Sequence, residues 1–213
     1  MSHLPIDREV VSDATEVKRG LRSIGLTPEI VREIAISAVS ARAESLAVDP
    51  IGAPGLLSYI HGVRAMRLQL LPLGWREDRS GNVEATVNHE LGVQLFFQNV
   101  DRACAAVDPN AISGKGSAAR NLVNSGQQDL FASKVTVAVL PTGKPPVVWL
   151  VCVSTNEATQ TICAEVSCPK AFDGSQFEGF SKRYFVMSET LEPSFKRRGD
   201  DGGMDIDVVV KKK

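Results

Sequence analysis

The sequence predicts an α+β protein in which an N-terminal helical hairpin packs on a mostly antiparallel β-sheet of about six or seven strands. This prediction rests on a change in the spacing of apolar residues along the chain. Apolar residues recur at helical spacing as far as residue 71, whereas several later segments alternate between apolar and polar residues, as strands do. Turns rich in Pro, Gly and Asn separate the later segments, so we expect neighbouring strands to pair with each other.

The first clear helix signal begins at Thr27. Thr27 can cap the helix, Pro28 suits its first position, and the charge of Glu29 complements the positive end of the helix dipole. We expect this helix to run to about residue 46. Its narrow apolar face is rich in small side chains and consists of Ile30, Ile34, Ala38 and Ala41. Such a face can pack closely against another helix.

A break rich in Pro and Gly at residues 49–55 separates this helix from a second one, predicted from residue 55 to residue 71. Two helices joined by a short loop most simply form an antiparallel hairpin laid against a sheet. The preceding residues, 1–26, have the composition of a polar, partly helical lead. We expect residues 27–187 to form a single α+β domain.

Strand periodicity begins after the helical hairpin. Two alternating segments on either side of residues 88–92 predict a β-hairpin. Further strands are expected at residues 134–140, 147–154, 159–167 and 183–187. The last part of the chain, residues 188–213, is expected to combine a mobile polar stretch with a C-terminal edge strand at 204–210, whose terminal lysines would oppose edge-to-edge pairing.

The composition is that of an ordinary globular protein. The chain has 213 residues, of which 43% are hydrophobic, and 24 Lys and Arg are balanced by 25 Asp and Glu. A net charge of -1 excludes the overall basic field of a protein that binds nucleic acid mainly by bulk charge. No apolar run approaches the roughly 18 to 20 residues that span a bilayer, and the first residues contain no apolar leader. We therefore expect a cytoplasmic protein without membrane contact.

Motifs for catalysis and for metal binding are missing from the sequence. The four cysteines and three histidines do not have the spacing of zinc ligands. Neither Gly-x-Ser-x-Gly nor a histidine in a segment typical of a catalytic turn occurs. The sequence thus predicts no catalytic residue, no metal site and no cofactor. It favours a non-enzymatic protein without deciding that question.

The segment from Ser113 to Arg120 is the first candidate for a contact with a charged ligand. Its glycines let several backbone N–H groups point to one place, a lysine adds charge, and a helix starting at residue 117 would add its positive end. The candidate phosphate- or partner-binding residues are Ser113, Gly114, Lys115, Gly116, Ser117 and Arg120. Residues 102–150 hold five Lys or Arg against two Asp, which strengthens this candidate. The segment departs from the P-loop pattern, because Gly116 follows the lysine, and a surface loop with a capped helix is the plainer interpretation.

Two carboxylates, Glu84 and Glu165, are candidates for a metal-dependent nuclease. Glu165 interrupts an apolar strand and shares a face with Cys163 and Ser167, so the simpler interpretation is that it faces solvent. Nucleases that hold a metal ion on a sheet commonly use Glu-x-Lys on one strand, but Ser167 occupies the third position here. Nothing in the sequence places Glu84 beside Glu165.

Two stretches in the middle of the chain form a recognisable pattern. The first is Leu73-Gly74-Trp75, which leads through Asn82-Val83-Glu84 to the run from Leu95 to Asp101, and the second is Ile112-Ser113-Gly114-Lys115-Gly116. They resemble a family of uncharacterised proteins carried by bacterial phages and integrative elements. The resemblance covers about half of the chain and contains no diagnostic catalytic motif. It implies a role in host takeover or in evading host defence, exerted by binding.

Three functional hypotheses follow. The first is a non-enzymatic binding protein of a phage or mobile element, which contacts a host defence protein or a nucleoprotein complex through the Ser113 to Arg120 segment, with direct nucleic-acid contact as an option. The second is a nucleotide-binding or metal-dependent nucleic-acid-processing enzyme centred on Lys115 and one of the two carboxylates. The third is a structural subunit that associates with itself through Ile30, Ile34 and Ala38.

Overall fold

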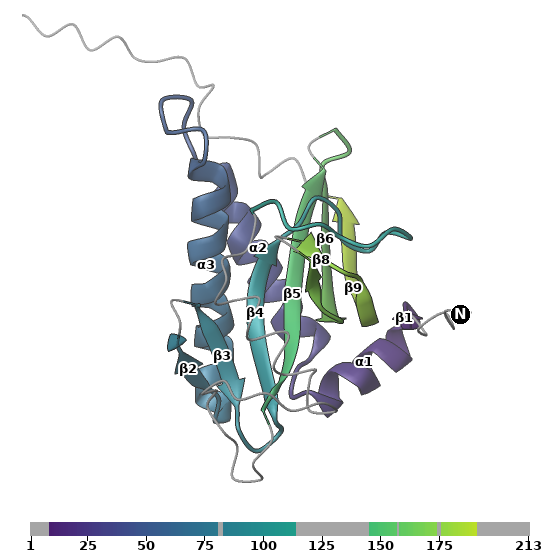
Figure 1. Cartoon of the computed structure of the whole chain (residues 1–213). Helices are drawn as coiled ribbons and strands as arrows, with labels where there is room; N and C mark the ends of the chain where they lie inside the picture. The colour runs from purple at the N-terminus through teal and green to yellow at the C-terminus, as the bar shows by residue number, and fades with distance from the viewer. Residues whose placement is uncertain (1–8, 81–82, 114–144, 157, 174–175, 191–213) are drawn as a thin grey trace, which may run out of the picture.

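A computed structural model describes residues 9–80, 83–113, 145–156, 158–173 and 176–190 of the chain. It confirms the α+β class: three α-helices, two of them the predicted hairpin, lie against a seven-stranded, mostly antiparallel sheet (Figure 1). The predicted strands at 134–140 and 204–210 lie outside the described residues. The helices are α1 (Ala14–Ser23), α2 (Pro28–Ala43) and α3 (Ala53–Leu70), followed by a 3-10 turn (Leu71–Leu73).

The sheet has the strand order β1-β9-β6-β5-β4-β3-β2. Neighbouring strands are antiparallel except for two parallel pairs, β1 with β9 and β4 with β5. A separate two-stranded hairpin pairs β7 with β8. The strands are β1 (Glu9–Val11), β2 (Arg76–Asp78), β3 (Ala85–Asn88), β4 (Val93–Asn99), β5 (Val147–Asn156), β6 (Thr161–Pro169), β7 (Phe172–Asp173), β8 (Gln176–Phe177) and β9 (Phe180–Thr190).

Local signals start the helices as expected. The backbone N–H of Ile30 donates to Oγ1 of Thr27 at 3.3 Å, and Pro28 occupies the first position of α2. Asp13 caps α1 in the same way, with its side chain accepting from the N–H groups of Thr15 and Glu16. Each cap satisfies donors that the first turn of a helix leaves without an internal partner.

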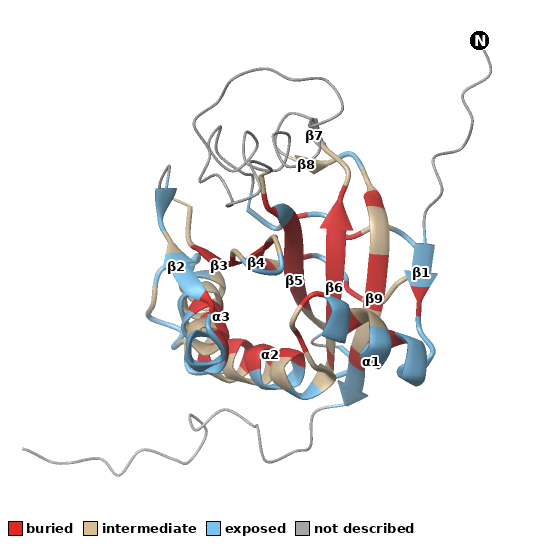
Figure 2. Ribbon diagram, turned by 90° about the horizontal axis from the view of Figure 1, so that it is seen from below, coloured by how far each residue is buried: buried red, intermediate tan, exposed pale blue. Residues whose placement is uncertain are grey.

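All three helices cover one face of the sheet, and the main core lies between them (Figure 2). The face of α2 that could have served self-association is part of this core: Ile34 and Ala38 are fully buried and Ile30 packs against them. That face is therefore not available to a second copy. Helical periodicity identifies an apolar face but does not say whether a sheet or another chain covers it.

The segment before the helical hairpin belongs to the same fold. β1 pairs with β9, and Val17 and Leu21 of α1 are buried in the main core. Most of α1 is polar, so the sequence pattern separates residues 1–26 as a lead, yet Val11, Ile24 and Leu26 join Val17 and Leu21 in the core. The structured part thus begins before residue 27.

The opposite face of the sheet carries a second, smaller core, to which β3, β4, β5 and β9 contribute. Part of this face is crossed by the residues that follow β4. We call residues 101–112 the strap, because its hydrogen bonds reach Ser154 of β5, Glu165 of β6 and Arg183 of β9 in turn. The strap ends on β8, where the side-chain amide of Gln176 bonds to both backbone groups of Ala111.

Candidate functional site

Glu165 lies under the strap in a buried ion pair with Arg183. Both side chains are fully shielded from solvent. Nε of Arg183 donates to one carboxylate oxygen at 2.8 Å and Nη2 to the other at 2.6 Å, which is the bidentate geometry of strong Arg–carboxylate pairs. Two further donors reach the carboxylate, the hydroxyl of Ser167 at 2.7 Å and the backbone N–H of Cys104 at 2.6 Å.

The guanidinium of Arg183 uses its remaining nitrogen to hold the strap. Nη1 donates to the carbonyl oxygens of Ala105 and Val107 and to a carboxylate oxygen of Asp108, at 3.0 to 3.3 Å. The ring of Phe185 lies 4.9 Å from the guanidinium carbon. Burial by itself would lower the pKa of Arg183, but the hydrogen bonds and charge of Glu165 outweigh it and raise that pKa. Arg183 therefore stays charged and fastens the strap to the sheet.

A β-bulge in β9, where Val186 is the extra residue, brings Arg183 to the face of the sheet that carries Glu165. The pairing of β6 with β9 shifts by one residue between Ala164 and Glu165, so that Ala164 faces Met187 while Glu165 faces Phe185. Such an extra residue bends the strand and redirects its side chains. Strict alternation along the sequence could not show this shift.

The expectation that Glu165 faces solvent is wrong, since its side chain is completely buried. The expectation that Glu165 and Ser167 share one face of the strand is confirmed, because the two side chains are hydrogen-bonded. Its two oxygens already bind four donors from protein groups, which leaves them poorly placed to bind a metal ion. The residue that sequence reasoning missed is Arg183, because a basic residue in a strand gives no sign of the acid it will meet.

Glu84 lies in a different part of the molecule. It accepts from Arg67 of α3 at 2.5 Å and lies 3.5 Å from Arg79, in a partly exposed charge cluster just before β3. β3 stands three places from β6 in the sheet, which corresponds to about 14 Å at the usual strand spacing. The structure therefore does not bring Glu84 and Glu165 together. No group of three or more potential metal ligands occurs among residues 9–190 outside the gaps named above.

Cys104 closes the strap over the ion pair. Its backbone adopts a left-handed conformation with φ of 55°, and its thiol lies within hydrogen-bonding distance of the carbonyl oxygens of Ala164 and Met187. Burial, together with the nearby negative charge of Glu165, raises the pKa of the Cys104 thiol to about 12. A thiol in this state is a poor nucleophile.

We predict that Cys104 resists alkylation in the folded protein. At pH 8 about one thiol in ten thousand would be ionised, so iodoacetamide should label Cys104 roughly a thousandfold more slowly than in urea. Peptide mass spectrometry at timed intervals measures this, with the unfolded protein as the control. Because the folded pKa is raised from 9.0, the contribution of this thiol to stability is present below pH 9 and is lost as the pH rises toward 12. Equal labelling rates in both states would contradict the prediction.

The strap begins beside a small hollow at the carboxyl ends of the parallel strands β4 and β5, where the ends of α2 and α3 also meet. Asn99 orders this corner: its side chain accepts from the hydroxyl of Ser58 at 2.8 Å and donates to the carbonyl oxygen of Gly55 at 3.0 Å. The hollow is lined by Val39, Arg42, Ser58, Asn99, Val100, Asp101, Ile112, Val153, Ser154 and Thr155. The crevice at the carboxyl ends of parallel strands is a common place for binding sites.

Asp101 starts the strap at the rim of the hollow. Its carboxylate accepts from the backbone N–H of Asn110 at 2.8 Å and from Nε of Arg102 at 2.9 Å. Partial burial would raise the pKa of Asp101, but these hydrogen bonds outweigh it and hold the pKa below its usual value. The carboxylate therefore stays charged at neutral pH and closes residues 101–110 into a compact loop.

The Ser113 to Arg120 segment leaves the described structure at this rim. Ile112 lines the hollow and donates from its backbone N–H to the carbonyl oxygen of Asn99, and Ser113 follows directly. The other candidate residues, Gly114, Lys115, Gly116, Ser117 and Arg120, lie outside the described residues. Their shape and contacts therefore stay predictions, but the place where the segment starts is known.

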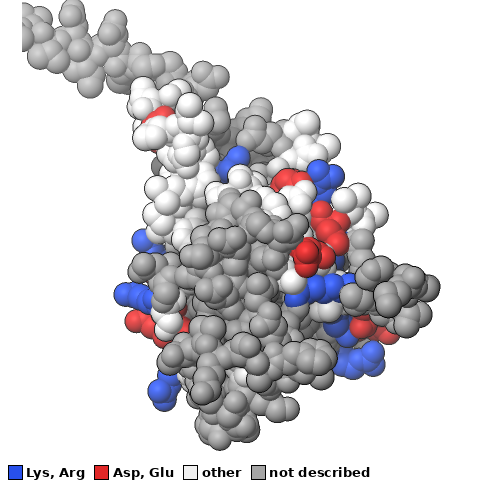
Figure 3. Space-filling model, in the orientation of Figure 1, with Lys and Arg blue, Asp and Glu red and all other residues white. Residues whose placement is uncertain are grey.

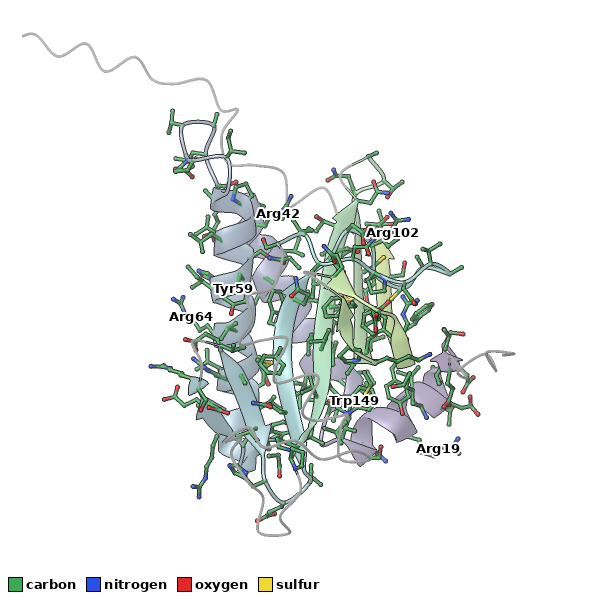
Figure 4. All side chains as sticks on the ribbon, viewed as in Figure 1. Arg19, Arg42, Tyr59, Arg64, Arg102 and Trp149 are labelled. Atoms are coloured by element: carbon green, nitrogen blue, oxygen red, sulfur yellow. The ribbon has the colours of Figure 1, made fainter. Side chains whose placement is uncertain are left out.

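Exposed side chains of mixed character surround the hollow. Arg42 and Arg102 both lie at the upper end of the molecule in Figure 4, close to the ends of the strands. The strap adds two exposed apolar side chains, Val107 and Ile112. Figure 3 shows acidic and basic groups side by side at this end, so the surface is mixed rather than basic.

Comparisons with protein-family models, with curated proteins and with solved structures find no match for this chain. None of the helices in the described part of the chain combines the length and the apolar character that a bilayer span requires.

Proposed function

We propose that this protein acts by binding another macromolecule through the end of the sheet where β4 and β5 finish. One observation carries the proposal: the buried pair of Glu165 and Arg183 fastens the strap to the sheet and so holds its exposed side chains in one arrangement beside the hollow. A contact surface that is ordered before binding loses little conformational entropy when the partner arrives. Arg102, Val107 and Ile112 form its described part.

The hollow itself favours a macromolecular partner over a small substrate. It is small, with a volume of about 70 Å³, and the polar groups of Ser58, Asn99 and Asp101 that line it are hydrogen-bonded to other protein groups. Small-molecule sites are usually larger and leave a few polar groups free to orient the ligand. Aliphatic side chains interspersed with arginine are typical of protein contact surfaces.

The identity of the partner is proposed from the resemblance to proteins of phages and integrative elements. We propose a host protein or nucleoprotein complex of the cytoplasm, for instance one that serves host defence, with the Ser113 to Arg120 segment extending the contact from the rim of the hollow. The alternative of a nucleic-acid-processing enzyme has less support, because Glu84 and Glu165 stand apart and Glu165 is engaged with Arg183.

Affinity capture from a bacterial lysate tests this proposal. The wild-type chain should retain a stoichiometric partner, and the double variant Arg102→Glu with Ile112→Asp should lose at least tenfold in retained partner, because it reverses a charge and removes an apolar contact on the strap. The variant Arg19→Glu, on the exposed surface of α1, is the control and should retain the partner fully. Nuclease treatment distinguishes a protein contact from one bridged by nucleic acid.

Two results would count against the proposal. Capture of no stoichiometric partner, with or without nucleic acid, would remove its basis. Equal capture by wild type and by the strap variant would show that binding occurs elsewhere on the molecule.

A further inference from the structure

The outward face of α3 is apolar and is covered by nothing in the described part of the chain. Leu56, Ile60 and Leu68 stand four or eight residues apart on this face and are exposed, as are Ile51 just before the helix and Leu73 just after it. Their exposed fractions range from 41% for Ile60 to 102% for Ile51. In Figure 3 the upper part of α3 and the loop before it form an almost uncharged surface. Exposed apolar surface of this extent usually marks a contact with a partner.

The positions of these side chains are symmetric about position 62. Ile51 and Leu73 are equally far from it in opposite directions, Leu56 and Leu68 likewise, and Ile60 is matched by Arg64. In a contact with two-fold symmetry, residue i of one copy meets residue j of the other, and j meets i. An antiparallel pair of α3 helices centred on this position would therefore place Leu56 against Leu68 and Ile51 against Leu73, with Ile60 against Arg64 near the centre.

We propose that two copies of this chain associate through an antiparallel α3–α3 contact. Leu56 of each copy would pack against Leu68 of the other, and Ile51 against Leu73. Arg64 would lay its aliphatic stem across Ile60 of the other copy and keep its guanidinium in water, as long basic side chains do at helix interfaces.

The exposed area is sufficient for a specific dimer. The five residues named above are joined by Leu46, Val48 and Leu71, and the eight together expose the equivalent of about five whole aliphatic residues. This corresponds to an area on the order of 800 Å², which is about what each partner contributes to a specific interface of standard size.

A charge-reversal experiment tests both the association and its register. Sedimentation at about 100 µM should give twice the mass of one chain for wild type. Leu68→Lys should give the single-chain mass, because two lysines would be buried against Leu56 of the other copy. The double variant Leu56→Glu with Leu68→Lys should associate more strongly than Leu68→Lys alone, because each new glutamate would meet a new lysine across the contact.

This stronger association can come only from pairing between copies. Positions 56 and 68 are 12 residues apart on one helix, or about 18 Å, which is too far for an ion pair within a chain. Arg64→Leu should lower the dissociation constant of the dimer at least tenfold, because a leucine packs better against Ile60 of the other copy. If the face instead binds a different protein through an acidic residue that meets Arg64, this variant should bind less well. Circular dichroism confirms that each variant is folded.

A single-chain mass for wild type would overturn the proposal. This holds even if the apolar face of α3 is then found to bind another partner. A dimer that survives Leu68→Lys, or a double variant that associates no more strongly than Leu68→Lys alone, would overturn it as well. Arg102→Glu with Ile112→Asp should leave the dimer mass unchanged, so failure of this proposal and failure of partner binding through the strap are distinguishable.

Discussion

Replacing Arg183 with methionine is expected to lower the free energy of unfolding by about 3–5 kcal/mol. The substitution leaves the carboxylate of Glu165 buried without its counter-charge, and it removes the three hydrogen bonds that Nη1 makes to the strap. Methionine fills the space of the aliphatic stem but not that of the guanidinium, so the loss would combine the missing charge and hydrogen bonds with a small cavity. Urea titration followed by circular dichroism measures the change.

A matched control exists in the Arg–Glu pair that joins α2 to β9. Arg32 donates to Glu189 through two nitrogens at 3.0 and 2.6 Å, but both side chains are nearly half exposed. Arg32→Met should therefore cost no more than about 1 kcal/mol. Combining Arg183→Met with Glu165→Leu should recover part of the loss, because no unpaired charge then remains buried. A loss below about 1 kcal/mol for Arg183→Met alone would show that the pair does not hold the strap.

Replacing Gly62 with alanine is expected to destabilise the protein by about 1–3 kcal/mol. A Cβ atom at this position of α3 would lie only 2.5 Å from atoms of the Phe97 ring. The ring belongs to β4 and is itself buried, so it cannot move aside without disturbing the core between α3 and the sheet. In an exposed helix the same substitution would stabilise by up to about 1 kcal/mol, so the sign of the change reports the close contact.

Gly55 in the first turn of α3 is the control for this prediction. A Cβ atom there would have no neighbour within 4 Å, and Gly55→Ala should raise stability by a few tenths to about 1 kcal/mol. Thermal unfolding of the two variants beside wild type measures both effects. Stabilisation by Gly62→Ala would mean that α3 lies farther from Phe97 than described here.

The helical hairpin and the hairpin of β3 and β4 follow closely from local patterns. Thr27 and Pro28 mark the start of α2, and the alternation around residues 88–92 marks the hairpin of β3 and β4. These features depend on interactions within a few residues, which the sequence displays directly. The parallel pairing of β4 with β5 is different, because it joins segments almost 50 residues apart and has no local signature.

The candidate site was predictable only in part. Ser113 stands at the rim of the hollow. The Ser113 to Arg120 segment, which the glycines and the charge single out in the sequence, therefore starts at a place suited to binding. Glu165 was recognised as unusual in its strand, but its partner was not. Asp101 and Asn110 gave a weak sign of an ordered loop, since such residues often close turns through their side chains.

The sequence by itself determined the α+β class, the helical hairpin and the absence of known catalytic motifs, because each of these depends on spacing along the chain. Only the tertiary structure decided that Glu165 and Arg183 form a buried pair, that the apolar face of α2 lies in the core, and that the apolar face of α3 lies outside it. The physical reason is that alternation and helical spacing show which side chains share a face. Which segment covers that face depends on contacts between residues far apart in the chain.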